Sequence, residues 1–134
     1  RGAHASLPPP ARDARGWGPR REREEREISM LAIYDVMLEV LGMLGDVERQ
    51  IGKHDRALMA QLQAADSSVL LNLAEGSGSR GGTRRSRYDS ALGSARETKA
   101  ILDVAVAKRY VREVPVELGP KLHRVIGTLV RLVQ

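Results

Sequence analysis

The sequence predicts an all-α fold, an antiparallel up-down-up-down four-helix bundle, on three observations. Apolar residues recur every three to four positions from residue 30 almost to the end of the 134-residue chain. The interruptions are short and rich in glycine or proline, so consecutive helices of roughly 20 to 28 residues must lie antiparallel. No strand is predicted, because the apolar run Val104 to Ala107 lies within a helical pattern.

Length and composition indicate a single domain stabilised by packing. The chain is 42% apolar, which is enough for one core. It has no cysteine, which excludes disulfides and thiolate metal sites. No run approaches the roughly 18 apolar residues of a membrane span, and the N-terminus lacks the apolar core of a secretory signal. We therefore expect a cytoplasmic protein with no membrane contact.

Residues 1–29 are predicted to be a disordered tail, and residues 30–134 the bundle domain. The tail contains three consecutive prolines and the charged run "RREREERE" from Arg20 to Glu27, and it has little to bury. Some helix in the charged run is compatible with its composition. The first methionine, Met30, stands where the apolar period begins. The tail is thus interpreted as a native extension, a vector remnant or a translated leader.

The first two helices are predicted from Leu31 onward and from about Asp55 to Gly76. The carboxylate of Asp55 is a candidate N-cap. The apolar stripe of the first helix comprises Tyr34, Met37, Leu41, Leu44, Val47 and Ile51. That of the second comprises Leu58, Leu62, Ala65, Val69 and Leu73.

The third helix is predicted to begin near Thr83, a candidate N-cap, and to end at about Tyr110. The fourth follows Pro115 or Pro120. The stripe of the third helix comprises Tyr88, Leu92, Ala95, Leu102 and Ala105. That of the fourth comprises Leu118, Leu122, Val125, Leu129 and Leu132.

Between the second and third helices, Gly76 to Gly81 spells the G-x-G-x-x-G pattern of dinucleotide-binding loops. Such a loop requires a strand before it, and here a helix precedes it. A Walker loop would require Gly-Lys-Ser/Thr, which is absent. We interpret the stretch as a turn in which Gly76 ends the helix in the left-handed conformation. Neither a nucleotide cofactor nor any other cofactor is expected.

Positive charge is concentrated on the third helix and its ends. Residues 80–112 contain nine Lys or Arg and three acids, against a net charge of +5 for the whole chain. The predicted nucleic-acid-binding residues are Arg80, Arg84, Arg85, Arg87, Lys108 and Arg109. Aromatic residues are few, so contacts with RNA are expected through phosphates. The alternative is a solvated charged face that binds nothing.

Polar and small residues on the second and third helices form a further pattern. "AADSSVLLNLAEGSGSR" (64–80), "ALGSARE" (91–97) and "ILDVA" (101–105) follow one another. The order N-[IL]-A-E-G and then A-x-G-S-x-x-E resembles the four-helix-bundle proteins first named from intervening sequences of bacterial 23S ribosomal RNA genes, the 23S rRNA-intervening sequence protein family. The resemblance covers about residues 30–134, and "LAIYDVMLEVL" looks like the family's first helix.

The resemblance implies a small cytosolic bundle that assembles into a homo-oligomeric ring, pentameric in relatives, with no established catalytic activity. A related branch is the accessory subunit of reverse transcriptases in diversity-generating retroelements, and binds RNA; this chain looks closer to the intervening-sequence branch. The family-motif polar cluster comprises Ser68, Asn72, Glu75, Gly76, Gly93, Ser94 and Glu97. Arg80 matches a basic residue that often follows the glycines.

These motif residues carry specific expectations. Gly93 and Ser94 are small enough to let the third helix approach the second, and Ser94, Asn72 and Ser68 can exchange hydrogen bonds. Glu75 and Glu97 are expected to accept hydrogen bonds or to pair with arginines from the turn or from a neighbouring subunit, unless both are simply exposed. Gln63, Ala64 and Asp66 depart from the basic or small residues of relatives, which weakens a basic face on the second helix.

Catalysis is not expected, and neither a metal site nor a small-molecule substrate is predicted. His4, His54 and His123 are isolated in the sequence and form no H-x-x-x-H or E-x-x-H pair. Glu75 and Glu97 lack a nucleophile or a metal to work with. Two functions remain open: a homo-oligomeric module that binds RNA or another polyanion, and a structural scaffold whose partner is a protein.

Overall fold

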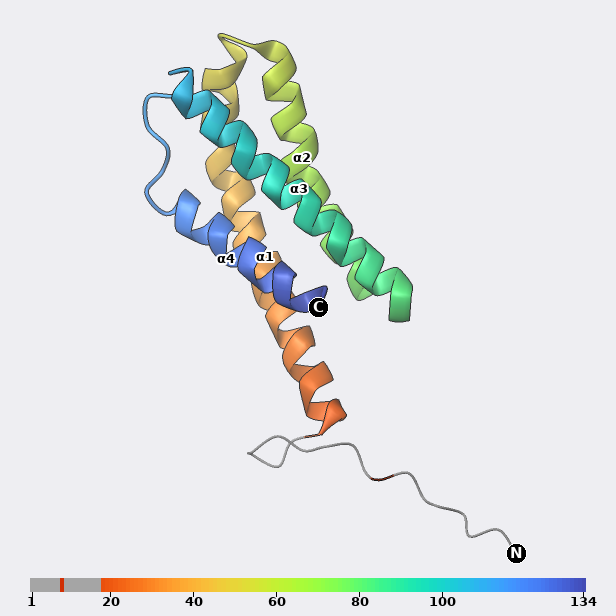
Figure 1. Ribbon diagram of the computed structural model, residues 1–134. Helices are drawn as coiled ribbons and strands as arrows, with labels where there is room; N and C mark the ends of the chain where they lie inside the picture. The colour runs from red at the N-terminus through yellow and green to blue at the C-terminus, as the bar shows by residue number, and fades with distance from the viewer. Residues whose placement is uncertain (1–7, 9–17) are drawn as a thin grey trace, which may run out of the picture.

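The computed structural model describes residue 8 and residues 18–134, and these form four α-helices and no strand (Figure 1). The helices are α1 (Pro19–Gly52), α2 (Arg56–Ser77), α3 (Gly81–Ala107) and α4 (Leu118–Leu132). Each helix contacts the next in the chain, and α1 also contacts α4. The prediction of an all-α fold of four helices is confirmed.

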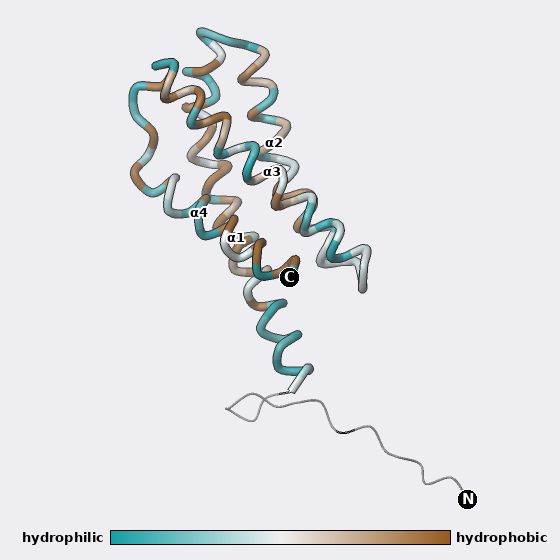
Figure 2. The backbone as a smooth tube through the Cα atoms, in the orientation of Figure 1, coloured by the Kyte–Doolittle hydropathy of each residue, from teal (hydrophilic) through white to brown (hydrophobic). Residues whose placement is uncertain are grey.

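The core lies where the apolar stripes of the four helices meet. All five predicted core residues of α3 and all five of α4 are buried, and four of the five on α2 are buried. On α1, Tyr34 and Leu41 are half-buried and the rest of the stripe is buried. Figure 2 shows brown, apolar residues along all four helices, and the first turns of α1 in teal. Side-chain periodicity therefore identified the buried faces.

α1 begins at Pro19, earlier than the predicted start at Leu31. Pro19 occupies its first turn, where a missing N–H costs nothing. Arg20 pairs with Glu24 at 3.3 Å and Arg21 with Glu25 at 4.0 Å, the i,i+4 spacing that supports an exposed helix. The structure therefore has helix where the sequence predicted a disordered tail with some helix in the charged run, because local ion pairs support helix without burial. Residues 1–7 and 9–17 of the predicted tail lie outside the described residues.

Burial along α1 nevertheless begins where the domain was predicted to begin. Met30 is the first buried side chain of the helix, and residues 19–28 are all exposed. The first turns of α1 therefore extend past the apolar core.

The turn between α2 and α3 differs in detail from its prediction. Asp55 caps α2 as expected, since its Oδ1 accepts a hydrogen bond from the Leu58 N–H at 2.9 Å. Gly76, in contrast, is buried inside α2, which ends at Ser77. The glycine with a left-handed backbone is Gly81, with φ of 57°, at the start of α3. The assignment of that conformation to Gly76 was wrong.

The ends of α3 are also shifted from their predicted positions. The N-cap is Arg80 rather than Thr83, and no side chain caps the first turn. The helix ends at Ala107, and Arg109 follows with φ of 61°, a conformation rare outside glycine. The fourth helix begins at Leu118, between the two prolines proposed to precede it.

One apolar stretch of α1 meets the length and composition requirements of a membrane span. An 18-residue window within Pro19–Gly52 has a mean hydropathy of 1.7, and 33% of it is buried inside the fold. Core helices of soluble proteins pass the same test. The expectation that no run approaches the length of a membrane span was wrong, whereas the expectation that the protein makes no membrane contact stays a prediction.

Candidate nucleic-acid interface

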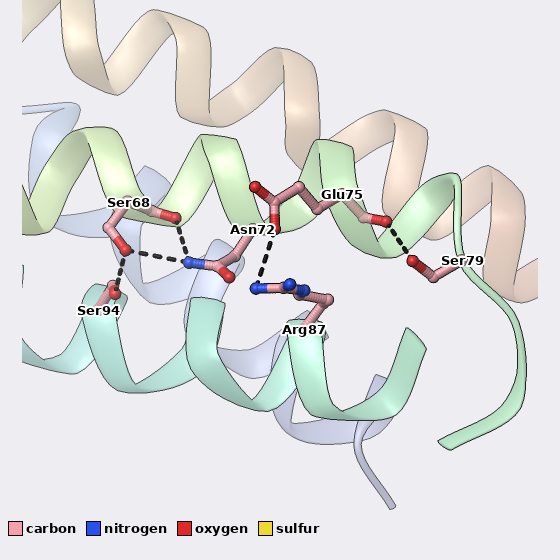
Figure 3. Close-up of polar contacts among 6 residues, drawn as sticks. All are labelled: Ser68, Asn72, Glu75, Ser79, Arg87 and Ser94. Atoms are coloured by element: carbon pink, nitrogen blue, oxygen red, sulfur yellow. Dashed lines mark hydrogen bonds and ion pairs between the residues drawn. The ribbon is translucent and has the colours of Figure 1, made fainter. Parts of the chain in front are cut away.

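Three of the motif residues form a hydrogen-bonded polar seam where α2 meets α3 (Figure 3). The hydroxyl of Ser94 donates to the Ser68 hydroxyl at 2.8 Å. The amide of Asn72 donates to the Ser68 carbonyl at 2.9 Å and to its hydroxyl at 3.0 Å. All three side chains are half-buried. The Ser94–Ser68 bond therefore crosses between the two helices as predicted, whereas Asn72 bonds only within α2.

The two motif glutamates are both paired and exposed. Arg87 of α3 lies 3.0 Å from the Glu75 carboxylate, with 48% and 56% of the two side chains exposed (Figure 3). Gln61 donates to Glu97 at 3.1 Å. The arginine partner comes from α3 and not from the turn. The contacts lie at the solvent edge of the seam, so burial adds little to their strength.

Glu75→Ala is expected to lower the free energy of unfolding by less than about 1 kcal/mol, because the ion pair with Arg87 is solvent-exposed. Denaturant titrations of Glu75→Ala, Arg87→Ala and the double variant would measure the coupling. A coupling above about 2 kcal/mol would show that the pair is desolvated, in conflict with its exposure in the structure.

The two motif glycines have opposite surroundings. A Cβ placed on Gly76 would overlap the ring of Tyr88, lying 2.7 Å from Cδ1. A Cβ placed on Gly93 would have nothing within 4 Å, and Gly93 is exposed. The expectation that Gly93 permits close approach of the helices was wrong, because it points away from α2. Gly76 has that role, since its missing side chain leaves room for the buried ring of Tyr88.

The predicted nucleic-acid-binding residues separate into two groups. Arg80, Arg84, Arg85 and Arg87 lie at the N-terminal end of α3, whereas Lys108 and Arg109 follow its C-terminal end. At about 1.5 Å per residue the two groups lie about 36 Å apart along the helix. The structure therefore does not assemble them into one patch. We call the first group the arginine end.

Charges at the arginine end differ in how far they are already compensated. Arg87 pairs with Glu75, and Arg84 donates to the Ser79 carbonyl at 2.8 Å. Arg80 and Arg85 are exposed, and no ion pair is found for either within residues 18–134. No acid lies in the first turn of α3. This helix N-terminus therefore concentrates uncompensated positive charge.

The second group adjoins an aromatic pair. The Lys108 ammonium lies 5.9 Å from the ring centroid of Tyr110, and that ring stacks on His54 at 5.0 Å with an interplanar angle of 7°. His54 therefore packs against the end of α3. His123 is exposed on α4, and His4 lies outside the described residues. Within residues 18–134, no three His, Asp or Glu side chains are grouped to hold a metal ion.

One buried carboxyl was missed by the sequence-based reasoning. Asp66 is 2% exposed, and its Oδ2 has no hydrogen-bond partner within the described part of the chain. Burial raises the pKa of Asp66 to about 8, and the neighbouring Glu48 carboxylate of α1 adds to this rise. Ser67 opposes it by donating to Oδ1 at 3.2 Å. A protonated Asp66 can donate to Glu48, which would satisfy Oδ2.

Asp66 was expected to weaken a basic face on the second helix, but it is buried and lies on no exposed face. It continues the buried stripe of α2, between Leu62 and Val69, and faces α1. Gln63 and Ala64 are exposed. Asp66 lies four residues after Leu62 and three before Val69. This helical spacing was the signal in the sequence that could have placed Asp66 on the buried face.

Comparisons with known proteins identify no relative of this chain. No protein-family model, no curated protein and no solved structure matches the chain. The resemblance to the 23S rRNA-intervening sequence proteins thus rests on the motif residues alone.

Proposed function

We propose that this chain is a four-helix bundle of the 23S rRNA-intervening sequence type, with antiparallel up-down-up-down topology. Residue pairs that run in opposite directions along neighbouring helices support the topology. They are Ser68–Ser94 and Glu75–Arg87 between α2 and α3, and Glu48–Gln63 and Gly52–Met59 between α1 and α2. The hydrogen-bonded polar seam supports the kinship.

The proposed function is non-enzymatic binding of RNA through the arginine end. The observation that carries it is the uncompensated charge of Arg80 and Arg85 at an uncapped helix N-terminus. Guanidinium groups contact phosphate oxygens in two-point geometry, and such contacts need no base stacking. The protein is proposed to act in the cytoplasm.

Homo-oligomerisation is part of the proposal. Ile28, Leu31 and Leu38 on α1 and Leu71 on α2 are large apolar side chains left exposed on the single chain. Exposed apolar surface of this kind is typical of protein interfaces. The same observation favours the second candidate, a structural or reverse-transcriptase accessory scaffold whose partner is a protein.

Charge removal at the arginine end tests the proposed function. Arg84→Gln/Arg85→Gln is expected to weaken binding of a generic single-stranded RNA and to reduce the slope of log affinity against log salt by about 1.4, since each lost phosphate contact accounts for about 0.7. Fluorescence anisotropy over a salt series would measure both quantities.

Two matched double variants separate local from general charge effects. Arg96→Gln/Arg124→Gln removes the same charge from exposed positions on α3 and α4 outside the arginine end, and should preserve most of the binding. Lys108→Gln/Arg109→Gln reports on the other end of α3. An equal loss in all three double variants would mean that only net charge matters. No binding at low salt would leave the protein-scaffold candidate.

A further inference from the structure

The inward faces of α1 and α3 become cationic where the core ends. On α1 the buried stripe of Met30 and Ile33 continues towards the N-terminus, at spacings of three and four, into Arg26 and Arg23. On α3 the stripe that begins at Tyr88 is preceded, one turn earlier, by Arg84 and Arg85. Two helices that share an apolar core thus extend it with guanidinium groups that face the same end of the fold.

A pocket lies between these side chains. Its volume is about 370 Å³, and its lining includes Arg23 and Arg26 of α1, Arg84 and Arg85 of α3, and Tyr88. Leu132 of α4 and Gln134 also line it. A volume of this size falls within the range typical of small-ligand sites. The arginines come from segments far apart in the chain, so the pocket is formed by the fold and not by one charged run.

The charge in the pocket is poorly compensated without a ligand. Four guanidinium groups line the pocket with one side-chain carboxylate, that of Glu27, and with Gln134, the last residue of the sequence, which adds an α-carboxylate. No ion pair is found for Arg23, Arg26 or Arg85 within residues 18–134. Like charges held in one concavity repel each other, and the N-terminal dipole of α3 adds to the positive potential. An anion in the pocket would relieve both effects.

Tyr88 supplies a neutral donor at the same place. Its side chain is 6% exposed, with the ring packed over Gly76. Burial raises the pKa of its phenol above 10.0, so the hydroxyl stays protonated at neutral pH. The lining is therefore rich in donors, with four guanidinium groups and the Tyr88 hydroxyl against the Glu27 carboxylate and Gln134, and a donor-rich lining suits an oxyanion.

We propose that this pocket binds a phosphate group in its dianionic form, either free inorganic phosphate or the terminal phosphomonoester of an RNA. The inference deepens the proposed RNA binding and rests on the same arginine end. A dianion is favoured over a backbone phosphodiester because four arginines against Glu27 and the Gln134 α-carboxylate leave a net charge of two positive units, where a diester supplies one negative charge. Arg23 and Arg26 belong to the site although they precede the predicted domain.

Isothermal titration calorimetry of the full chain with inorganic phosphate, at constant ionic strength, tests the pocket. Arg23→Gln/Arg26→Gln is expected to weaken phosphate binding at least about tenfold, because two charge-assisted contacts are lost. The matched control is Arg20→Gln/Arg21→Gln, which removes the same charge from the same helix at positions that do not line the pocket. It should bind phosphate as the unmodified chain does.

The source of the phosphate is distinguished with two RNAs of one sequence, carrying either a 5′-phosphate or a 5′-hydroxyl. Tighter binding of the 5′-phosphate RNA, lost in Arg23→Gln/Arg26→Gln, would assign the terminal phosphomonoester. Equal binding of the two RNAs, together with calorimetric binding of inorganic phosphate, would assign free phosphate. Either result supports the pocket.

The binding measurements differ according to whether the phosphate-binding proposal or the RNA-binding proposal is wrong. Absence of phosphate binding, or an equal loss in both α1 double variants, would overturn the pocket. RNA binding that still falls in Arg84→Gln/Arg85→Gln would then keep the proposed function intact. Conversely, phosphate binding that depends on Arg23 and Arg26 without any RNA binding would support the pocket and overturn the RNA-binding function.

Discussion

Replacing Asp66 with asparagine is expected to stabilise the protein, and to do so far more at alkaline than at acidic pH. Asp66 is buried against Glu48, and its pKa is raised from 3.8 to about 8 in the fold. Asparagine has almost the same shape, cannot become charged, and can donate a hydrogen bond to Glu48. The substitution therefore removes a buried charge without opening a cavity.

The sign of the pH dependence follows from the raised pKa. Between about pH 4 and pH 8 the folded chain holds a proton on Asp66 that the unfolded chain has released. The free energy of unfolding must then fall as the pH rises through this window, and level off above it. Each pH unit contributes up to about 1.4 kcal/mol, so the stabilisation in Asp66→Asn is on the order of several kcal/mol above the window.

Thermal or urea unfolding across this pH range would measure the effect. The control is Asp35→Asn on the exposed face of α1, which should leave the pH profile unchanged. Glu48→Gln should lower the pKa of Asp66 only in part, because burial is the larger cause of the shift. An unmodified chain whose stability does not fall between acidic and alkaline pH would contradict a buried, protonated Asp66.

Gly76→Ala is expected to destabilise the fold by about 1–3 kcal/mol. The added methyl group would occupy space held by the ring of Tyr88, which is itself buried and packed between α2 and α3. Relief requires the ring to leave its position or the two helices to separate. Chemical denaturation would give the loss, and a circular dichroism spectrum would verify that the helices persist.

Gly93→Ala is the matched control, with an expected effect of opposite sign. Its Cβ would meet nothing within 4 Å, and the position is in the interior of α3. Alanine there should stabilise by about 0.5–1 kcal/mol, the usual gain over glycine in a helix. Equal destabilisation by both substitutions would contradict the packing of Tyr88 over Gly76.

The apolar stripes were predictable because each helix has one face to bury and the period of that face is fixed by helix geometry. On α4, the spacing alone was enough to assign four residues to the core: Leu118, Leu122, Val125 and Leu129. The helix ends were less predictable. The start of α1 at Pro19 depends on local ion pairs, which act without any burial and are invisible to a search for apolar periodicity.

The candidate site was predictable only in part, because charge counts along the chain do not say which charges meet. Arg84 and Arg85 were identified from the local excess of arginine. Arg23 and Arg26 were assigned to a tail, since their relation to α3 depends on how the helices pack. The roles of Gly76 and Gly93 were likewise settled by which neighbour faces each residue, and that is a property of the tertiary structure.

The two basic groups are separated by the length of α3. This separation sets the minimum length of an RNA that could contact both groups in the proposed binding mode. In the proposed RNA-binding mode, an oligonucleotide shorter than about 36 Å would contact one group at a time, whereas a longer one would bridge both and bind bivalently. Affinity as a function of oligonucleotide length should then rise in a step and not smoothly. Neutralising Lys108 and Arg109 should abolish the step while leaving the affinity for short oligonucleotides unchanged.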